Sequence, residues 1–273
     1  MTDRVSVITT VLNEANSVDI LLDSLAQQTR VPDEVVVVDG GSTDGTLESL
    51  ERHALRSPYP LRVISRPGHN ISQGRNVAIA AAQHALIAAT DAGVRLDREW
   101  LEHLLAPLQG SSSADVVSGA FVAAPETLFE MALGAVTLPA ISEIDPANFN
   151  PSSRSIAFRR EAWQRVGGYP EWLDYCEDLL FDLCLRDARF RFTFSPHAVA
   201  RFRPRPTLSA FFKQYYRYAR GDGKADLWRY RHLVRYGTYL VILPALVVLS
   251  ITWSPLWLLG IALGLLLMMR KPL

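Results

Sequence analysis

The chain has 273 residues, of which 49% are apolar, enough for one large α/β domain or two small ones. Lys and Arg together number 28, and so do Asp and Glu, so no overall field argues for nucleic acid as a partner. The two cysteines, Cys176 and Cys184, are too few for a disulfide framework or a zinc site and favour a reducing compartment.

Through the first half of the chain, short β-branched segments alternate with helical patterns, which is typical of βαβ units and a mainly parallel sheet. We predict strands over residues 5–11, 34–38, 61–65 and 85–90, and helices over residues 17–27, 46–56 and 72–82. Polar residues gather where these strands end. In open α/β sheets ligands bind at that edge, because its loops are free of packing and helix N-termini point toward it.

The second half has a less regular pattern. Residues 124–153 show weak periodicity and read as an insertion. Strands are expected over residues 155–158, 190–194 and 198–202, and helices from Glu161 onward, over residues 175–187 and over residues 208–220. The last of these helices leads toward an apolar segment at the end of the sequence.

That segment, from Gly237 to Met269, contains no charged residue, as membrane segments do. A single helix over it would be about 50 Å long, more than a bilayer core of about 30 Å, and Pro244 and Pro255 interrupt it. We therefore predict a hydrophobic hairpin of two short helices that turns near Trp253. A shallow re-entrant or interfacial hairpin is an alternative, and so is a buried hairpin in a soluble core.

Basic residues flank the apolar segment on both sides, and the positive-inside tendency places both flanks in the cytoplasm. They are Arg229, Arg231 and Arg235 before it and Arg270 and Lys271 after it. The N-terminus lacks the pattern of a secretory signal, so we expect the larger part of the protein to stay on the cytoplasmic side of a cell membrane. The predicted division is a domain over residues 1–225 and a basic, membrane-associated helical hairpin over residues 226–273.

Three polar residues at the predicted strand edge are candidates for binding a ligand. Asp39 ends the second strand and can accept a hydrogen bond from a base or a ribose, although an Asx-type turn explains it equally well. Asp91 follows the fourth strand, where it could reach a metal ion or a ribose. Arg75 lies in the first turn of its helix and could bind phosphate, unless it is a solvated surface arginine.

Two later groups of residues could also carry chemistry. Glu177 and Asp178 open an amphipathic helix, and one of them could be a general base, but acidic residues also occur in first helical turns because they complement the helix dipole. Gln214 and Arg217 lie in an aromatic and basic segment that ends near Tyr218. That segment could hold a phosphate, or it could anchor a helix beside a bilayer.

Taken in order, five motifs make the chain resemble the large inverting family of glycosyltransferases called family 2. They are residues 9–14 (TTVLNE), 38–46 (VDGGSTDGT), 74–76 (GRN), 90–93 (TDAG) and 177–178 (ED). The resemblance covers residues 5–223. It implies the GT-A nucleotide-diphospho-sugar transferase fold and transfer of a sugar from a nucleotide-diphospho-sugar, most often a UDP-sugar, in one displacement with inversion.

The resemblance also implies roles for individual residues. Thr9, Glu14 and Asp39 would line the nucleotide pocket, Asp91 would belong to the metal and diphosphate motif, and Asp178 would be the catalytic base, with Glu177 beside it. The predicted nucleotide-sugar site comprises Thr9, Asn13, Glu14, Asp39, Gly74, Arg75 and Asp91. Gln214 and Arg217 are assigned to the leaving-group or acceptor phosphate, and the insertion over residues 124–153 to the acceptor side.

Two departures from the family pattern bear on mechanism. The Asp-x-Asp metal motif reads Asp91-Ala92-Gly93, so the second carboxylate is absent and a divalent cation, Mg²⁺ or Mn²⁺, would rest on Asp91, donor phosphates and water. The Gln-x-x-Arg-Trp motif of processive members ends in Tyr218 instead of Trp. We therefore favour transfer of a single sugar over polymerisation. With the apolar segment, a lipid-linked or cell-surface glycan acceptor is the expected partner.

Two other readings compete with this one. A nicotinamide-dependent oxidoreductase would share the βαβ pattern, but the glycines at 40, 41 and 45 do not form G-x-G-x-x-G. A catalytically inactive, membrane-anchored nucleotide-binding or scaffold protein of the same fold would also lack part of the metal motif. The presence of Glu177 and Asp178 favours the enzyme.

Overall fold

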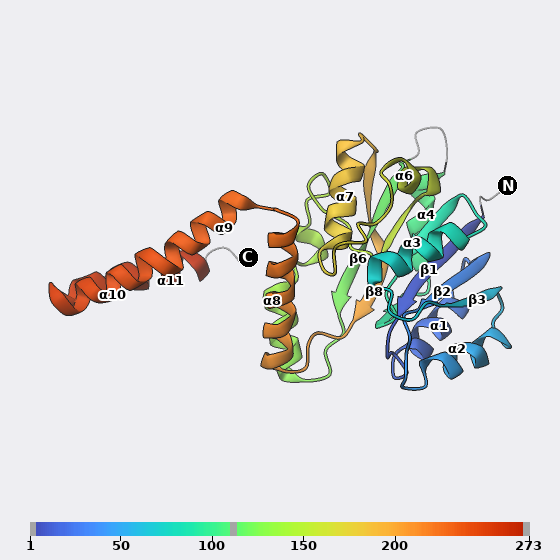
Figure 1. Ribbon diagram of the computed structural model, residues 1–273, viewed down its shortest axis with the longest axis horizontal. Coiled ribbons are helices and arrows are strands. Elements are labelled where there is room, and N and C mark those ends of the chain that lie inside the picture. Colours follow the sequence, from blue (N-terminus) through green and yellow to red (C-terminus); the bar gives the residue numbers. More distant parts are fainter. Residues whose placement is uncertain (1–3, 110–113, 270–273) are drawn as a thin grey trace.

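A computed structural model describes residues 4–109 and 114–269 and shows one mixed sheet of eight strands with helices on both faces (Figure 1). The strand order is β3-β2-β1-β4-β7-β6-β8-β5. The strands are β1 (Val5–Val11), β2 (Glu34–Asp39), β3 (Leu61–Ser65), β4 (Leu86–Ala89), β5 (Val94–Leu96), β6 (Val116–Ala123), β7 (Ile156–Arg159) and β8 (Phe192–Phe202). The domain helices are α1 (Val18–Ala26), α2 (Thr46–Ala54), α3 (Ile71–Ala81), α4 (Trp100–Leu105), α5 (Leu128–Thr137), α6 (Arg160–Arg165), α7 (Glu177–Asp187) and α8 (Leu208–Lys224).

Strands β1 to β4 are parallel, and β1, β2 and β4 are buried on both faces, which explains their near-continuous apolar sequences, whereas the edge strand β3 is half-buried. In β2, Val35 and Val37 pack into one core with α1, whereas Val36 and Val38 pack on the opposite face with α3. A fully buried side chain of this size contributes about 1.5–3 kcal/mol. Because β1 to β4 are parallel, their carboxyl ends lie together at one edge of the sheet.

The second half of the sheet adds antiparallel pairs. β7 lies antiparallel to both β4 and β6, and β8 runs parallel to β6. We expected two strands between residues 190 and 202, which is wrong, because β8 is a single strand with an irregularity: Gly119 pairs with Ser195 and Ala120 with Val199. Pro196 falls in this bulge, where its missing N–H costs no ladder hydrogen bond.

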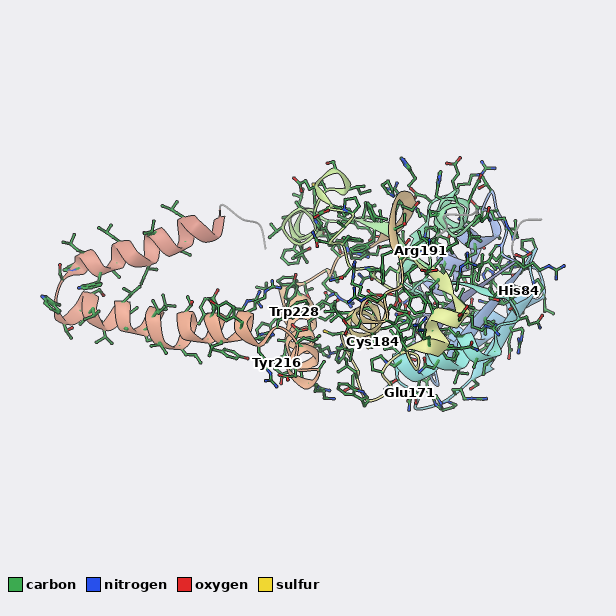
Figure 2. All side chains as sticks on the ribbon, turned by 90° about the horizontal axis from the view of Figure 1, so that it is seen from above. His84, Glu171, Cys184, Arg191, Tyr216 and Trp228 are labelled. Carbon is green, nitrogen blue, oxygen red and sulfur yellow. The ribbon has the colours of Figure 1, made fainter. Side chains whose placement is uncertain are left out.

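The C-terminal segment forms the predicted hairpin, which projects away from the sheet domain (Figures 1 and 2). Helix α9 (Arg229–Tyr236) continues through a π-helical turn over Gly237–Ile242 into α10 (Leu243–Thr252), and α11 (Leu258–Met269) returns alongside it. The turn falls at Trp253 as predicted. We expected Pro244 to interrupt the helix, which is wrong: Pro244 lies in the first turn of α10, and the π-helical turn before it absorbs the missing hydrogen bond.

The first arm of the hairpin is longer than the short helix that we expected. It covers 24 residues, Arg229–Thr252, and its most apolar 18-residue window has a mean hydropathy of 1.8 with none of that window buried inside the described part of the chain. At 1.5 Å per residue it is about 36 Å long, enough to cross a bilayer core. Since the arm does not pack into the domain, the reading as a buried core hairpin is wrong. The second basic flank, Arg270 and Lys271, lies outside the described residues.

Candidate functional site

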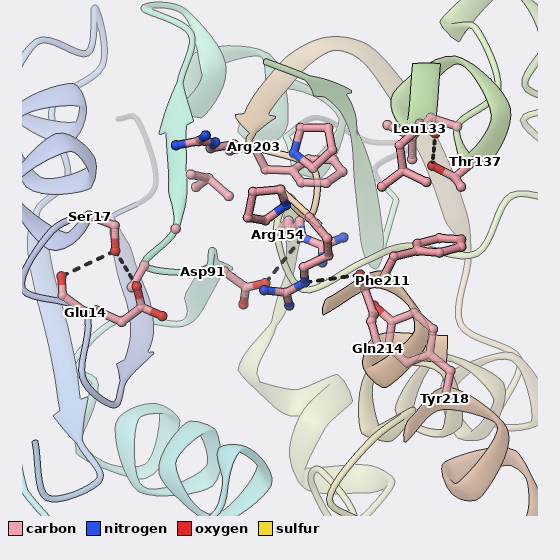
Figure 3. A pocket seen from close by; sticks show the side chains of 18 of the residues that line it. Glu14, Ser17, Asp91, Leu133, Thr137, Arg154, Arg203, Phe211, Gln214 and Tyr218 are labelled. Carbon is pink, nitrogen blue, oxygen red and sulfur yellow. Dashed lines mark hydrogen bonds and ion pairs between the residues drawn. The ribbon is translucent and has the colours of Figure 1, made fainter. Parts of the chain in front are cut away.

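Two adjoining cavities, of about 660 and 840 Å³, open at the carboxyl edge of β1 and β4 (Figure 3). Residues from four parts of the chain line both of them: the start of α3, the end of β4, the turn before β7, and α8 with the loop before it. The shared residues are Ile71, Asp91, Arg154, Arg205, Gln214 and Tyr218. The predicted Glu14 lines the smaller cavity, and Arg75, Glu177, Asp178 and Arg217 line the larger one.

A buried ion-pair network stands at the centre of the site. The Arg75 guanidinium is 2% exposed and donates to Glu177 at 2.7 Å and to Asp91 at 2.9 Å. It also lies 5.3 Å from the ring centroid of Tyr169. Burial lowers the pKa of Arg75, but Asp91 and Glu177 more than offset it, so the guanidinium stays charged. Arg75 is therefore not a solvated surface arginine: it joins α3 to β4 and α7, and its assignment to phosphate binding stays a prediction.

Arg154 is the second cation on Asp91, and the sequence analysis did not single it out. Its Nε lies 3.6 Å from Asp91 Oδ2, and its guanidinium lies 4.6 Å from the ring centroid of Phe202. Tyr218 also forms a hydrogen bond to this side chain. Figure 3 shows Arg154 and Asp91 in the middle of the cleft, with Glu14 on one side and Gln214 on the other.

The adjacent acids Glu177 and Asp178 have different surroundings. Glu177 is 6% exposed and held by Arg75, and burial raises its pKa to about 7 even though Arg75 pulls it down. Asp178 is only partly buried, lines the larger cavity, and accepts a hydrogen bond from the N–H of Leu179. Of the two, Asp178 therefore has the carboxylate that a substrate can reach.

Helix α8 closes the larger cavity because Gly221 lets it approach the loop before α7. A Cβ at position 221 would lie 2.5 Å from the carbonyl oxygen of Tyr175. Gln214 binds the Arg205 Nε and the Tyr218 hydroxyl with its side chain, and Arg217 lies over the Tyr175 ring at 5.2 Å. Gln214 and Arg217, both predicted as site residues, line the larger cavity. Gln214 also accepts the hydrogen bond that holds Arg205 beside it.

The N-terminal motif residues form the loops at the edge of the site. Asp39 accepts hydrogen bonds from the backbone N–H groups of Gly41 and Ser42, which is the Asx-type turn. Asn13, at a φ of 58°, accepts from the N–H of Thr43 and so ties the first motif to the second. Glu14 lines the cavity and pairs with the hydroxyl of Ser17.

Four predicted residues, Thr9, Asn13, Asp39 and Gly74, are absent from the lining of both cavities, and two of them, Gly74 and Thr9, take part in packing. Gly74 packs against β1, where a Cβ would meet Thr10 Cγ2 at 2.8 Å, so its lack of a side chain serves the contact of helix and strand. Thr9 is 1% exposed, and its Oγ1 finds no hydrogen-bond partner among the residues that the structure describes. Their assignment to nucleotide binding stays a prediction.

The residues missed from the sequence are arginines. Arg154 follows a Pro-Ser-Ser turn, and Arg205 stands in the sequence Arg203-Pro204-Arg205-Pro206 after β8. The sequence feature that could have identified Arg154 and Arg205 is their position in proline-containing turns next to strand ends.

The carboxylates at this site do not fit a divalent cation held by the protein. Among the described residues, no group of three or more His, Cys, Asp or Glu side chains is placed to hold a metal ion. Asp91 already faces Arg75 through one oxygen and Arg154 through the other, and Gly93 supplies no ligand where the metal motif has its second carboxylate. Mg²⁺ and Mn²⁺ require several oxygen ligands, so most would have to come from the donor and water.

Residues 6–165, more than half of the chain, match the family model described as Glycosyl transferase family 2. The chain belongs to this family. Its GT-A fold and use of nucleotide-sugar donors follow, which confirms the predicted family and fold class.

Two curated relatives are similar to this family 2 glycosyltransferase over most of its length. The succinoglycan biosynthesis protein ExoA of Rhizobium meliloti (strain 1021) is 28% identical over 230 residues, which cover 78% of this chain and 67% of that protein. Glycosyltransferase AglE of Haloferax volcanii is 25% identical over 234 residues, covering 82% of this chain and 74% of the relative.

Among solved structures, the mannosyltransferase PcManGT from Pyrobaculum calidifontis in complex with GDP-Man and Mn²⁺ is similar to the whole chain. The TM-score is 0.76 at 22% identity, covering 100% of this chain and 82% of that one. TarS of S. aureus in complex with UDP-GlcNAc has a TM-score of 0.62 at 23% identity, covering 76% of this chain and 60% of that one. These likenesses show the fold.

Proposed function

We propose that this glycosyltransferase moves one sugar from a nucleotide-diphospho-sugar to a membrane-bound acceptor, with inversion and with Asp178 as the base. One observation carries the proposal: a partly exposed carboxylate, Asp178, faces the same cavity as Asp91 and Arg154. The cavity thus offers a proton acceptor and a cation to opposite sides of a bound donor.

The proposed reaction is a single displacement at the anomeric carbon. Asp178 takes the proton of the acceptor hydroxyl as its oxygen forms the new bond to C1. The bond from C1 to the β-phosphate oxygen breaks, and its electron pair stays on the departing nucleoside diphosphate. Glu177 takes no proton in this scheme, because its ion pair with Arg75 holds the start of α7 in place.

Replacing Asp178 by Asn tests the base. General base catalysis is worth about 10²- to 10⁴-fold, so D178N should lose that much transfer rate while its nucleotide affinity stays within about twofold. Asp187→Asn, at the exposed far end of the same helix, is the matched control and should keep the wild-type rate. A loss of nucleotide binding in D178N would remove Asp178 from the role of base.

The donor nucleotide is proposed from the family and its neighbours. UDP-sugars are the commonest donors that the resemblance implies, but one structural neighbour was solved with GDP-Man and another with UDP-GlcNAc. Calorimetric titration of the detergent-solubilised protein with UDP, GDP and dTDP, each with Mn²⁺, Mg²⁺ or EDTA, identifies the base and the metal requirement. A protein that binds a nucleotide but transfers no sugar would support the inactive scaffold instead.

The acceptor is proposed to be lipid-linked or a cell-surface glycan, with the domain on the cytoplasmic side. The exposed apolar helix over Arg229–Thr252 supports attachment to a membrane. Removing the residues after Arg235 should abolish transfer to membrane-extracted acceptors and leave nucleotide affinity unchanged. Full transfer to such acceptors by the shortened protein would contradict this assignment.

A further inference from the structure

The least usual feature of the site is that Asp91, the remaining carboxylate of the metal motif, lies between two guanidinium groups. Arg75 is buried behind it, whereas the Arg154 side chain is 24% exposed and lies at the junction of the two cavities. Arg75 donates hydrogen bonds to the carboxylates of Glu177 and Asp91. Arg154 is therefore the cation of this network that a bound ligand can reach.

Arg154 is held in this place from several sides. Asp91 faces its Nε, the Phe202 ring lies under its guanidinium at 4.6 Å, and Phe121 lies at 6.0 Å. An arginine carries five N–H donors in a planar fork that matches phosphate oxygens. The shortest contact with Asp91, 3.6 Å, is too long for a hydrogen bond, so the guanidinium retains N–H donors beyond its contact with Tyr218.

We propose that Arg154 binds the diphosphate of the donor nucleotide and neutralises the charge that develops on it, taking over the task that a divalent cation performs where the metal motif has two carboxylates. The inference rests on the proposed function, because it assumes a nucleotide-diphospho-sugar in this cleft. Asp91 then orients a guanidinium instead of ligating a metal ion. A cation fixed by the fold requires no metal in solution.

The position of the missing carboxylate allows the complementary change. Gly93 lines the smaller cavity, and apart from its two chain neighbours no described residue has an atom within 4 Å of where its Cβ would be. Its φ is not in the left-handed region, so Gly93→Asp can be accommodated without backbone strain. This variant restores an Asp-x-Asp sequence beside Arg154.

Calorimetric titration of the full chain in detergent, with UDP and GDP and with uridine and guanosine as probes, tests the inference. The wild type should bind one diphosphate with an affinity that changes less than about threefold between EDTA and Mn²⁺. R154M should weaken that diphosphate by about 10- to 100-fold, as expected for charge-assisted hydrogen bonds, and leave the matching nucleoside unchanged. The control R201M breaks the Arg201–Asp97 ion pair outside both cavities and should bind like the wild type.

The double variant G93D/R154M should replace the need for Arg154 with a need for a divalent cation. It should bind the diphosphate weakly in EDTA and regain at least tenfold with Mn²⁺, a gain that R154M alone should lack. Wild-type binding that disappears in EDTA, or diphosphate affinity unchanged in R154M, would overturn the inference while leaving the proposed function standing. Failure of the wild type to bind any of the four probes under either condition would overturn the proposed function and this inference together. If R154M does not fold, the comparison of the wild type in EDTA and in Mn²⁺ still tests the inference, because binding that requires Mn²⁺ would overturn it.

Discussion

Replacing Arg75 by Met tests whether this arginine stabilises the fold through its buried ion pairs or binds phosphate. The change removes hydrogen bonds of 2.7 and 2.9 Å and leaves Glu177, with a side chain 8% exposed, without its cation. Breaking a buried pair by removing one partner costs about 3–5 kcal/mol. Asp91 adds little to this cost, because its side chain is 32% exposed and retains Arg154.

The cost of Arg75→Met should grow with pH. Burial already raises the pKa of Glu177 above its ordinary value, and loss of Arg75 raises it further. A carboxyl group whose pKa is raised on folding contributes most below its unfolded pKa, and that contribution is lost as the pH rises through the folded pKa. The variant should therefore lose stability between pH 6 and pH 8 more steeply than the wild type. Adding Glu177→Gln should restore part of the loss.

Urea denaturation followed by tryptophan fluorescence measures these differences. Arg66→Met, at an exposed position next to the same site, should stay within about 0.5 kcal/mol of the wild type. If Arg75→Met unfolds at the wild-type urea concentration but loses nucleotide affinity, Arg75 is a phosphate ligand, and its assignment to a purely structural role is wrong.

Two further predictions concern packing and buried charge. Gly74→Ala places a methyl group against Thr10 and should lower the free energy of unfolding, measured by urea denaturation, by about 1–3 kcal/mol. Gly223→Ala, where the structure shows open space around the added methyl group, should not lower it. Equal effects of the two changes would contradict the packing role of Gly74. Burial raises the pKa of Asp182 well above its usual range, so ionisation destabilises the fold as the pH rises. Asp182→Asn should reduce the loss of stability between pH 5 and pH 8, and an unchanged pH slope would show that Asp182 does not titrate in that range.

The sequence predicted the first half of the sheet to within about two residues at each strand and helix end. Buried parallel strands such as β2 are short, continuous runs of valine bounded by turn residues, so their signal is local. The strands β5 and β6 and the helix α4 were not predicted. β5 has only three residues, and it forms a strand because it pairs with β8, more than a hundred positions later.

For the site, the motifs predicted which residues gather but not how they pair. Asp91 and Glu177, both predicted as site residues, line the larger cavity, yet nothing in the local sequence shows that Arg75 binds both, since its partner on α7 is 102 positions away. Arg154 belongs to none of the five motifs. Its proximity to Asp91 arises only because β7 pairs with β4 and brings the turn before β7 beside the end of β4.

The alternation of charge across the site explains why neighbouring acids can differ in role. Glu177, Arg75, Asp91 and Arg154 form a line of opposite charges that runs from the start of α7 to the junction of the cavities. Each inner member has a partner on both sides, and the line joins α7 to β4. Asp178 stands one residue beyond the end of this line; it influences Arg75 and Arg154 electrostatically but, among the described residues, forms no ion pair with either. A carboxylate positioned by its neighbour's ion pair, yet free of that pair, is what a general base requires.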